Sequence, residues 1–488
     1  MKIGVIGTGY VGLVTGTCLA ELGHEVICVD AIAQKIDLLN NGGCPIYEPG
    51  LTELIRAQRQ AGRLAFTTEL AEMAPDRDAI FLAVGTPPKP DGEADLSFLE
   101  AAVAELAPHL AGFTALVTKS TVPVGTGDRI ESQLAGLRPD ADVAVVSNPE
   151  FLREGSAIGD FLQPDRIVVG TDDLRARETM QRIYAPLTSK GAPLLLTDRR
   201  TSELIKYAAN AFLAVKISYI NEIADLCEEL GADARRVAEG MGLDARIGSR
   251  FLEPGPGFGG SCFPKDTDAL LSTGRAAGVP LRVVTAASTA NRERKRLLAA
   301  RVAAVAGELK GRTVAVLGLT FKAGTDDMRE AASLELIPDL QRRGATVRAY
   351  DPKGMEAARD LLPGVTFCRD AFEAARGASA VVILTEWPEF RELDLARLAE
   401  EVETPLLIDL RNLFEPESVT RAGWDYVSIG RPAVAAQEAT GAVRPGARPG
   451  ARGGLCPHRP RGARGPGGDA PRPPARRPGS RRGGLIVR

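Results

Sequence analysis

One short segment of the chain concentrates residue types that support covalent chemistry. Residues 254–266 read PGPGFGGSCFPKD, so six glycines or prolines precede a single cysteine, Cys262. This composition predicts a tight loop that leaves backbone N–H groups free near the thiol. Those groups and the adjacent Lys265 would favour the thiolate, which is the nucleophilic form. Cys262 is therefore a candidate nucleophile, and the alternative is a small buried side chain with a packing role.

Two polar residues interrupt an apolar segment further upstream. Lys206 and Asn210 are four positions apart, so they share one face of a helix. The Lys206 ammonium either reaches solvent or is held in a site, and the pattern leaves both open. None of the three histidines, His24, His109 and His458, has a context that suggests catalysis. Acid/base chemistry would then fall to Lys, Asp, Glu or a bound water.

A glycine-rich turn near the N-terminus has the spacing of a dinucleotide site. Residues 7–12 read GTGYVG after an apolar strand and at the start of a helix. Gly7 permits the turn, Gly9 lets a pyrophosphate approach the backbone, and Gly12 lets helix and strand pack closely. Asp30 ends the next strand, 18 residues after Gly12. Its carboxylate would accept hydrogen bonds from the adenosine ribose and repel a 2′-phosphate, which predicts NAD over NADP.

Short apolar strands that alternate with helices are expected to position these residues. A helix is predicted at about 11–22, and the first strands are predicted at 2–6, 25–29, 79–84, 115–119, 143–147 and 166–170. This alternation is typical of a parallel, doubly wound sheet. A long helix at about 201–230 follows, with Thr201 or Ser202 as its cap and Gly231 as its end.

A second α/β unit is predicted after this helix and two further helical segments. The helical segments are predicted at 234–240 and 280–306, and the later elements are strands at 313–317, 346–350, 380–384 and 405–409 and a helix at 331–343, with the unit ending near 426–430. The turn after its first strand lacks the three-glycine spacing. A nucleotide diphosphate anchored by Lys322 is therefore favoured there over a second dinucleotide.

Composition narrows the class of protein. The 488-residue chain has seven cysteines and no CxxC pair, which predicts a reducing cytoplasm and no metal site. Residues 3–20 are uncharged, but their five glycines argue against a membrane span or signal peptide. Because the whole chain carries −3 and residues 441–488 carry +11, residues 1–440 carry −14, so the core is not expected to bind nucleic acid. The Gly, Pro and Arg content after residue 434 predicts a disordered tail.

Eight motifs, in order along residues 1–432, resemble those of the UDP-glucose 6-dehydrogenase family, within the wider UDP-glucose/GDP-mannose dehydrogenase family. They are GTGYVG at 7–12, GTP at 85–87, KSTVPVGT at 119–126, NPEFLREG at 148–155, ELIKYAANAFLA at 203–214, FGGSCFPKD at 258–266, LGLTFKAGTDDMRE at 317–330 and YDP at 350–352. The forms at 148–155 and 261–266 look more like the UDP-glucose branch than the GDP-mannose or UDP-N-acetylmannosamine branches.

The resemblance implies an α/β fold with two Rossmann-like, doubly wound parallel-sheet domains joined by a central long helix. The implied domains are NAD-binding at 1–200, helical and dimer-forming at 201–305, and UDP-sugar-binding at 306–433, before a tail at 434–488. The implied reaction oxidises UDP-glucose twice to UDP-glucuronate. Cys262 would trap the intermediate aldehyde as a thiohemiacetal, and the resulting thioester would be hydrolysed.

The resemblance also implies a role for individual residues. The implied catalytic residues are Cys262, Lys206, Asn210, Asp266, Thr121 (holding a water) and Glu150 (a base in thioester hydrolysis). NAD would contact Gly7, Gly9, Tyr10, Val11, Gly12, Asp30, Lys35, Thr86, Thr121, Glu154, Lys265 and Arg329. The UDP-sugar would contact Glu150, Phe151, Leu152, Arg153, Glu154, Lys206, Asn210, Phe251, Leu252, Glu253, Pro254, Gly255, Gly259, Lys322 and Arg411, with Arg246 reaching the neighbouring subunit's substrate.

Two rival interpretations remain at this point. The first is a two-electron hydroxy-acid dehydrogenase in which Cys262 is only structural. The second is a nucleotide-sensing or RNA-binding regulator that acts through the arginine-rich tail. In the family pattern, Glu253 and Pro254 occupy variable loop positions, and the tail has no counterpart.

Overall fold

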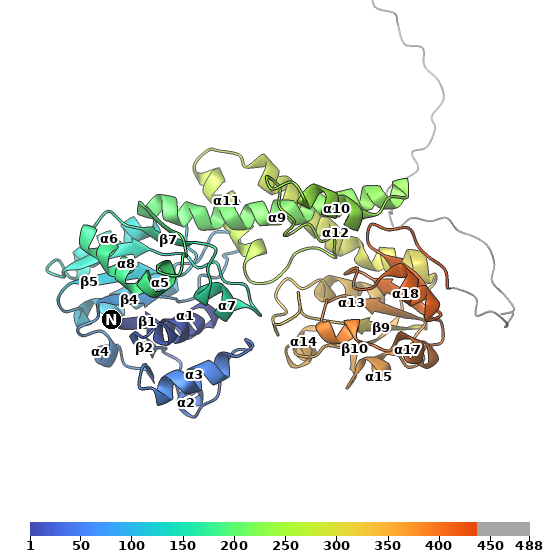
Figure 1. The fold of residues 1–488 in the computed structure, drawn as a ribbon, viewed down its shortest axis with the longest axis horizontal. Coiled ribbons are helices and arrows are strands. Elements are labelled where there is room, and N and C mark those ends of the chain that lie inside the picture. Colours follow the sequence, from blue (N-terminus) through green and yellow to red (C-terminus); the bar gives the residue numbers. More distant parts are fainter. Residues whose placement is uncertain (437–488) are drawn as a thin grey trace, which may run out of the picture. The chain divides into compact units, whose positions relative to one another are not determined.

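The first α/β unit is built on an eight-stranded sheet in the order β3-β2-β1-β4-β5-β6-β7-β8 (Figure 1). A computed structural model describes residues 1–436. The strands are β1 Lys2–Ile6, β2 Glu25–Val29, β3 Leu64–Thr67, β4 Ala79–Leu82, β5 Thr114–Thr118, β6 Val143–Ser147, β7 Ile167–Gly170 and β8 Leu194–Thr197. Paired strands are parallel except β6 and β7, which meet antiparallel at Ser147 and Gly170. The predicted doubly wound sheet is thus confirmed, with one antiparallel junction added.

Helices pack against this sheet. They are α1 Tyr10–Glu21, α2 Ala33–Asn40, α3 Leu51–Gln60, α4 Leu70–Met73, α5 Ser97–Leu106, the 3₁₀ turn η1 Ala107–His109, α6 Thr126–Leu137, α7 Ala157–Leu162 and α8 Leu174–Thr188. Alternate strand residues feed separate cores, Ile3 and Val5 into one and Ile6 and Leu82 into the other. The strand order reverses between β1 and β4, so the loops after these strands diverge and open a binding crevice.

The central helix α9 spans Arg199–Leu230. Its cap is Asp198, whose carboxylate accepts a hydrogen bond from the Thr201 N–H at 2.8 Å, so the prediction of Thr201 or Ser202 as the cap was wrong. Gly231 ends the helix in the left-handed conformation at φ 69°, as predicted. The helix starts earlier than predicted because an Asp side chain three residues upstream satisfies the free N–H of its first turn.

The buried face of α9 is unusually polar. The helix packs against α11 (Phe263–Ala276) and α12 (Arg282–Ala306), with α10 (Ala234–Gly242) nearby (Figure 1). Glu203, Lys206 and Asn210 are buried, whereas the apolar residues Phe212 and Tyr219 are 65% and 47% exposed. The apolar spacing therefore predicted the helix correctly. Several of those apolar side chains, however, lie on the exposed face of the helix and not on its buried face.

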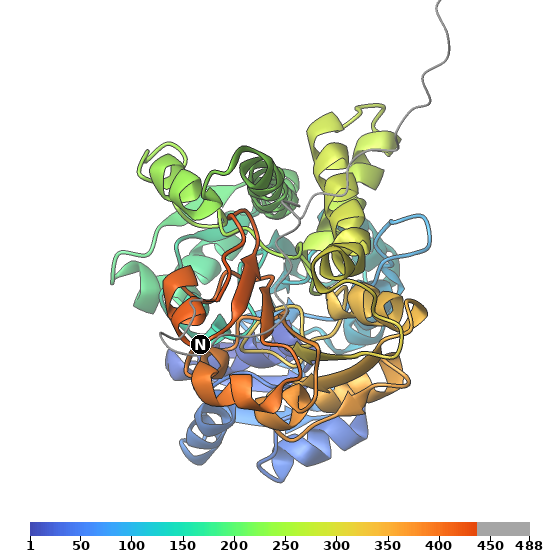
Figure 2. The same cartoon turned by 90° about the vertical axis from the view of Figure 1, so that its right-hand side faces the viewer.

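The second α/β unit is drawn from yellow-orange to red in Figure 2. Its six-stranded sheet is fully parallel, in the order β11-β10-β9-β12-β13-β14. Its strands are β9 Thr313–Leu317, β10 Thr346–Tyr350, β11 Thr366–Phe367, β12 Ala380–Ile383, β13 Leu406–Asp409 and β14 Asp425–Ser428. Its helices are α13 Ser333–Arg342, α14 Met355–Leu361, α15 Ala371–Ala375, α16 Pro388–Arg391, α17 Leu395–Glu401 and α18 Pro416–Arg421. The strand order reverses between β9 and β12, which opens a second crevice.

The described chain ends just beyond this sheet. Val434 and Tyr426 exchange two backbone hydrogen bonds of 3.0 and 2.8 Å, so Val434 forms an isolated antiparallel bridge beside β14. The rest of the predicted disordered tail, residues 437–488, lies outside the described residues. Within residues 1–436, no helix combines the length and apolar character needed to cross a bilayer.

Candidate active site

Cys262 stands at the end of the predicted glycine- and proline-rich loop and at the N-terminus of α11. The loop crosses close to the second α/β unit: the Gly260 N–H donates to the Arg329 carbonyl at 2.8 Å. A Cβ on Gly259 would lie 2.3 Å from the Glu330 carbonyl oxygen, so a larger residue there would force the loop away. The loop was predicted correctly, whereas the helix that begins immediately after the cysteine was not.

The charges around Cys262 differ from those that the local sequence indicated. Burial raises the pKa of its thiol, the Glu150 carboxylate raises it further, and the Lys206 ammonium opposes both. The Lys265 ammonium lies 2.8 Å from the Asp266 carboxylate, so it is paired away from the sulfur. Burial and Glu150 therefore act against the predicted thiolate, and Lys265 does not supply the predicted charge because it is paired with Asp266. The contribution of the backbone N–H groups stays a prediction.

Lys206 is held inside the site and does not reach solvent. Its Nζ lies 3.1 Å from Glu150 Oε1, and both side chains are almost completely buried. Burial alone would lower the pKa of Lys206, but Glu150, Cys262 and Asp266 together raise it. Burial would raise the pKa of Glu150, yet Lys206 and the Leu152 N–H, 2.6 Å from Oε2, hold it low. The pair is therefore ionised on both sides.

Asn210 connects this helix to the residues after the cysteine. Its Nδ2 donates to Asp266 Oδ2 at 2.6 Å, and the Lys265 Nζ donates to the other carboxylate oxygen at 2.8 Å. Asp266 is 1% exposed. Because α9 and α11 pack side by side, Lys206, Asn210 and Asp266 are brought to one end of the Cys262 loop.

Glu154 joins three segments beside the cysteine. Its carboxylate accepts hydrogen bonds from Ser261 Oγ at 2.9 Å and Thr325 Oγ1 at 3.1 Å. Arg329 lies 3.8 Å away. Burial and the nearby Asp327 raise the pKa of Glu154 despite these partners. Glu154 thus ties the Cys262 loop to the loop after β9.

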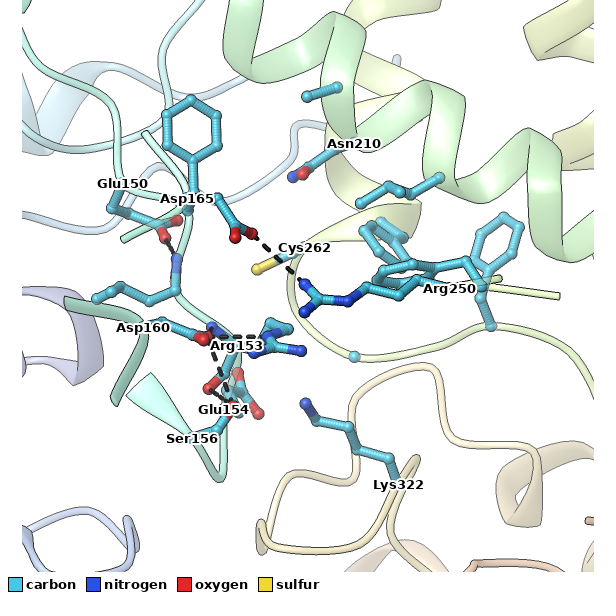
Figure 3. A pocket seen from close by; sticks show the side chains of 18 of the residues that line it. Glu150, Arg153, Glu154, Ser156, Asp160, Asp165, Asn210, Arg250, Cys262 and Lys322 are labelled. Carbon is cyan, nitrogen blue, oxygen red and sulfur yellow. Dashed lines mark hydrogen bonds and ion pairs between the residues drawn. The ribbon is translucent and has the colours of Figure 1, made fainter. Parts of the chain in front are cut away.

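The Cys262 sulfur points into a cavity of about 1020 Å³ (Figure 3). Figure 3 places Asn210 on one side of the sulfur and Lys322, from the second α/β unit, on the other. The predicted site residues that line this cavity are Glu150, Phe151, Leu152, Arg153, Glu154, Lys206, Asn210, Phe251, Glu253, Pro254, Gly255, Gly259, Cys262, Lys322 and Arg411. Residues far apart in the chain therefore meet at one cavity.

Other predicted residues lie outside the cavity wall. Leu252 is buried, with 3% of its surface exposed. The Arg246 side chain is 89% exposed and pairs with Asp244 at 2.6 Å, away from this chain's own cavity. Arg329 pairs with Asp327 at 2.8 Å.

The crevice after β1 has the geometry that a dinucleotide requires. Gly7 adopts φ 99°, and a Cβ on Gly12 would lie 1.9 Å from the Gly7 carbonyl oxygen. A Cβ on Gly9 would meet nothing within 4 Å, so the space over the N-terminus of α1 is open to a pyrophosphate. Asp30 Oδ2 accepts hydrogen bonds from the N–H and hydroxyl of Thr8, both at 2.8 Å. These residues fit NAD.

The remaining predicted cofactor residues surround this crevice. Lys35 Nζ lies 3.5 Å from Asp30 Oδ2. Thr86 Oγ1 donates to the Thr121 carbonyl at 2.9 Å, which joins the loops after β4 and β5. Val11 packs against the first core. The Tyr10 hydroxyl donates to Glu48, so it supports the fold around the crevice.

Several residues around the cavity were not predicted. Lys119 and Asn148 also line it, immediately after β5 and β6, and Arg166 and Arg250 line it from other segments. The rule that ligands bind at the carboxyl ends of parallel strands would have indicated Lys119 and Asn148. No local signal distinguishes Arg166 or Arg250 from surface arginines. Figure 3 shows Arg250 directed at Asp165, 3.5 Å away.

Three domains of one family match the chain in order. The UDP-glucose/GDP-mannose dehydrogenase family matches with its NAD binding domain at residues 1–188, its central domain at 200–293 and its UDP binding domain at 315–416. A UDP-glucose 6-dehydrogenase of Rhizobium meliloti (strain 1021) is 55% identical over 436 residues, which are 88% of this chain and 100% of that protein.

Solved structures agree with this assignment. A UDP-glucose dehydrogenase from Pyrobaculum islandicum is 40% identical with a TM-score of 0.79, over 84% of this chain and 94% of that one. A UDP-D-ManNAc dehydrogenase from Pyrococcus horikoshii is 27% identical with a TM-score of 0.78, over 88% and 99%. With the NAD-type crevice and the cysteine-lined cavity, these matches show that the chain is an NAD-dependent dehydrogenase and belongs to the UDP-glucose/GDP-mannose dehydrogenase family.

Proposed function

We propose that this dehydrogenase oxidises UDP-glucose to UDP-glucuronate in two steps through covalent intermediates on Cys262. The observation that carries the proposal is the Cys262 thiol, which faces a cavity walled by both α/β units and stands beside the buried Lys206–Glu150 pair. The match to a UDP binding domain and the 55% identity to a UDP-glucose 6-dehydrogenase support the choice of substrate.

The cavity wall suits an anionic nucleotide sugar. Lys322, Arg391 and Arg411 line it from the second α/β unit. Arg411 is oriented by hydrogen bonds to the Leu384 and Phe321 carbonyls at 2.9 and 2.7 Å. Cations at this end would bind the diphosphate, which would direct the glucose towards Cys262.

The first oxidation needs a base for the C6 hydroxyl proton and a charge to stabilise the alkoxide. Lys206 and Asp266 would supply these functions, and Asn210, fixed by its hydrogen bond to Asp266, would position the oxygen. NAD, when bound, accepts the hydride that leaves carbon in each oxidation. The product of the first step is an aldehyde at C6.

Cys262 then makes the second oxidation possible. A bare aldehyde has no hydroxyl on its carbon to expel a hydride, whereas its thiol adduct has one. The raised pKa of Cys262 fits a thiol that loses its proton as the C–S bond forms. Loss of a hydride and a proton from the thiohemiacetal leaves a thioester. Thr121 would hold the attacking water, and Glu150 would take one of its protons. The thioester would then break to give the carboxylic acid and free Cys262.

Another nucleotide sugar is the alternative substrate. The P. horikoshii structure named for UDP-D-ManNAc has almost the same TM-score as the UDP-glucose dehydrogenase structure, so fold alone does not discriminate. The higher sequence identity favours UDP-glucose. Incubation with NAD and UDP-glucose, GDP-mannose or UDP-N-acetylmannosamine separates these options, and faster NADH formation with either of the other two would reassign the substrate.

The test of the covalent scheme is stoichiometry together with loss of the thiol. The wild-type enzyme should form two NADH for each UDP-glucose consumed, and Cys262→Ala should release no UDP-glucuronate because the aldehyde has no trap. Cys44→Ala is the matched control, since Cys44 is also a half-buried free thiol. One NADH per substrate from the wild type, or acid production by Cys262→Ala, would refute the scheme.

We also propose that two copies pair through α9. Its exposed face is apolar over most of its length, with Leu204, Phe212, Tyr219, Leu226 and Leu230 all more than 40% exposed. Exposing such an apolar stripe to water is unfavourable, and burial against a second copy would remove it from solvent. Arg246, which points away from its own cavity, would then reach the partner's substrate.

We also propose that this enzyme acts in the cytoplasm. All six cysteines among residues 1–436 are free thiols. A nucleophilic thiol must stay reduced between turnovers, and the cytosolic thiol pool maintains that state.

A further inference from the structure

A second buried lysine lines the same cavity as the Glu150–Lys206 pair. Lys119 follows β5, is 5% exposed and lines the cavity. Its Nζ donates to Asn148 Oδ1 at 3.1 Å and to the Tyr184 hydroxyl at 3.4 Å. Both partners are neutral, and no carboxylate of residues 1–436 forms an ion pair with this ammonium. A buried charge without a counter-ion is costly, so its retention calls for a function.

The Lys119 ammonium is fixed in place by the residues around it. The Tyr184 hydroxyl donates to Asn148 Oδ1 at 2.6 Å, and Asn148 Nδ2 donates to the Val168 carbonyl at 2.7 Å. The rings of Phe161 and Tyr184 lie 5.9 and 6.0 Å from Nζ. Residues in β7, α7 and α8 and just after β6 therefore surround the ammonium. We expect it to stay in place when a substrate binds.

Lys119 and Glu150 influence each other's charge. Burial lowers the pKa of Lys119 to about 8, Glu150 opposes that shift and Lys206 reinforces it. In turn Lys119 helps to lower the pKa of Glu150. Arg166, just before β7, and Cys262, at the start of α11, also interact electrostatically with Glu150. Glu150 thus lies among three cations and one thiol.

Lys206 has to interact with two different groups during the proposed reaction. In the free enzyme it pairs with Glu150 at 3.1 Å, yet it must also stabilise charge on the substrate oxygen. When Lys206 turns to that oxygen, burial would drive Glu150 to take up a proton, and a protonated Glu150 cannot act as a base. A fixed cation on the same cavity wall would prevent this: Lys119 and Glu150 both line the cavity, and Lys119 is bonded to Asn148, two residues before Glu150.

We propose that Lys119 is a positioning residue that keeps the Glu150 carboxylate ionised while water attacks the thioester, an inference that rests on the proposed function. In that step the water oxygen bonds to the thioester carbon and one water proton passes to Glu150. The C–S bond breaks, and its electron pair leaves on the Cys262 sulfur. Lys206 therefore stabilises charge on the reacting oxygen, and Lys119 keeps the base, Glu150, ionised.

The experiment removes the charge of Lys119 and follows the pH dependence of hydrolysis. In Lys119→Gln, which keeps a hydrogen-bonding side chain, the acidic limb of the kcat–pH profile should move up by about one pH unit. Near neutral pH the hydrolysis step should slow, so a covalent adduct on Cys262 should accumulate in acid-quenched samples analysed by mass spectrometry. Lys119→Arg should restore the wild-type limb.

Tyr184→Phe is the matched control. It removes a hydroxyl from the same Asn148 network and leaves the ammonium in place, so its acidic limb should coincide with that of the wild type. Lys119→Met repeats the test if the Gln variant does not fold. An unmoved limb in a folded charge-deletion variant, or an equal shift in Tyr184→Phe, would overturn the role of Lys119. A wild-type enzyme without two NADH per UDP-glucose would overturn the proposed function and this inference with it.

Discussion

At the scale of single residues, Asp30 supports the fold and is our proposed ribose-binding group in the cofactor site. Its Oδ2 accepts two hydrogen bonds from Thr8, its Oδ1 accepts one from the Ile32 N–H at 3.0 Å, and Lys35 lies nearby. Burial acts to raise the pKa of Asp30, but these hydrogen bonds and Lys35 lower it overall. The carboxylate is therefore ionised where the adenosine ribose is expected, and we propose that its charge repels a 2′-phosphate.

Replacing this carboxylate should change cofactor preference. In Asp30→Ser, the loss of a charged hydrogen-bond acceptor should raise the KM for NAD by about 10-fold or more. Removal of the negative charge should at the same time improve use of NADP. Steady-state kcat/KM for both cofactors measures the change, and Asp37→Ser on the adjacent α2 controls for loss of a carboxylate elsewhere. An unchanged preference for NAD would contradict the assigned role of Asp30.

At the scale of elements, α9 links the two halves of the chemistry. Three turns of one face carry Glu203, Lys206 and Asn210. Lys206 and Asn210 face the cysteine, whereas Glu203 accepts hydrogen bonds from the Gly125 and Gly127 N–H groups at 2.6 and 2.8 Å, at the start of α6. The loop that carries Thr121 ends at this helix start. Movement of α9 would therefore affect both the cofactor crevice and the sugar site.

Glu203 predicts a pH dependence of stability. Burial raises the pKa of this carboxyl from 4.5 to about 7, against the opposing hydrogen bonds from Gly127 and Gly125. The folded state therefore binds the proton more tightly than the unfolded state. The stabilisation is present below pH 4.5 and is lost as the pH rises through about 7.

The measurement compares thermal unfolding of the wild type and Glu203→Gln at pH 5.5 and pH 8. The variant cannot ionise at this position, so the wild type should lose more stability between the two pH values, by on the order of 2 kcal/mol. Glu178→Gln, on α8, controls for removal of a carboxyl group elsewhere in the first α/β unit. Equal changes of Tm for wild type and Glu203→Gln would exclude this role.

At the scale of the whole molecule, the arrangement of α9 suggests that one chain does not act alone. Its buried face is polar because it builds the site, and its exposed face is apolar. The loop after α10 that carries Arg246 is held to this helix by Lys216, whose Nζ donates to the Ile247 and Gly248 carbonyls at 3.2 and 3.3 Å. The surface proposed for pairing and the exposed arginine are therefore parts of one rigid arrangement.

A charged pair of substitutions on this surface should separate the proposed dimer. Tyr219→Arg with Leu226→Arg places cations on the apolar stripe, so the double variant should elute as a monomer in size exclusion with light scattering. Its KM for UDP-glucose should rise, because Arg246 no longer reaches a partner's substrate. Arg246→Ala should raise the same KM and remain dimeric. A wild-type protein that is monomeric at micromolar concentration would contradict the pairing.

The sequence by itself determined the inventory of chemistry and most of the fold. The glycine spacing at 7–12, Asp30 at the end of the next strand, and the strand and helix periodicities are local patterns, and the structure has elements close to where they were predicted. Such features depend on residues within a few positions of one another, so the amino-acid sequence is enough to predict them.

Only the tertiary structure decided the charges of the site. Lys206 was left open by its pattern, and Lys265 was expected to act on Cys262, because neither burial nor a partner can be inferred from neighbours in sequence. Glu150, Lys206 and Cys262 come from three separate segments, and it is their meeting in a buried site that fixes each pKa. The buried face of α9 was decided in the same way: a helix pattern gives the spacing of side chains, but what packs against each face depends on the rest of the chain.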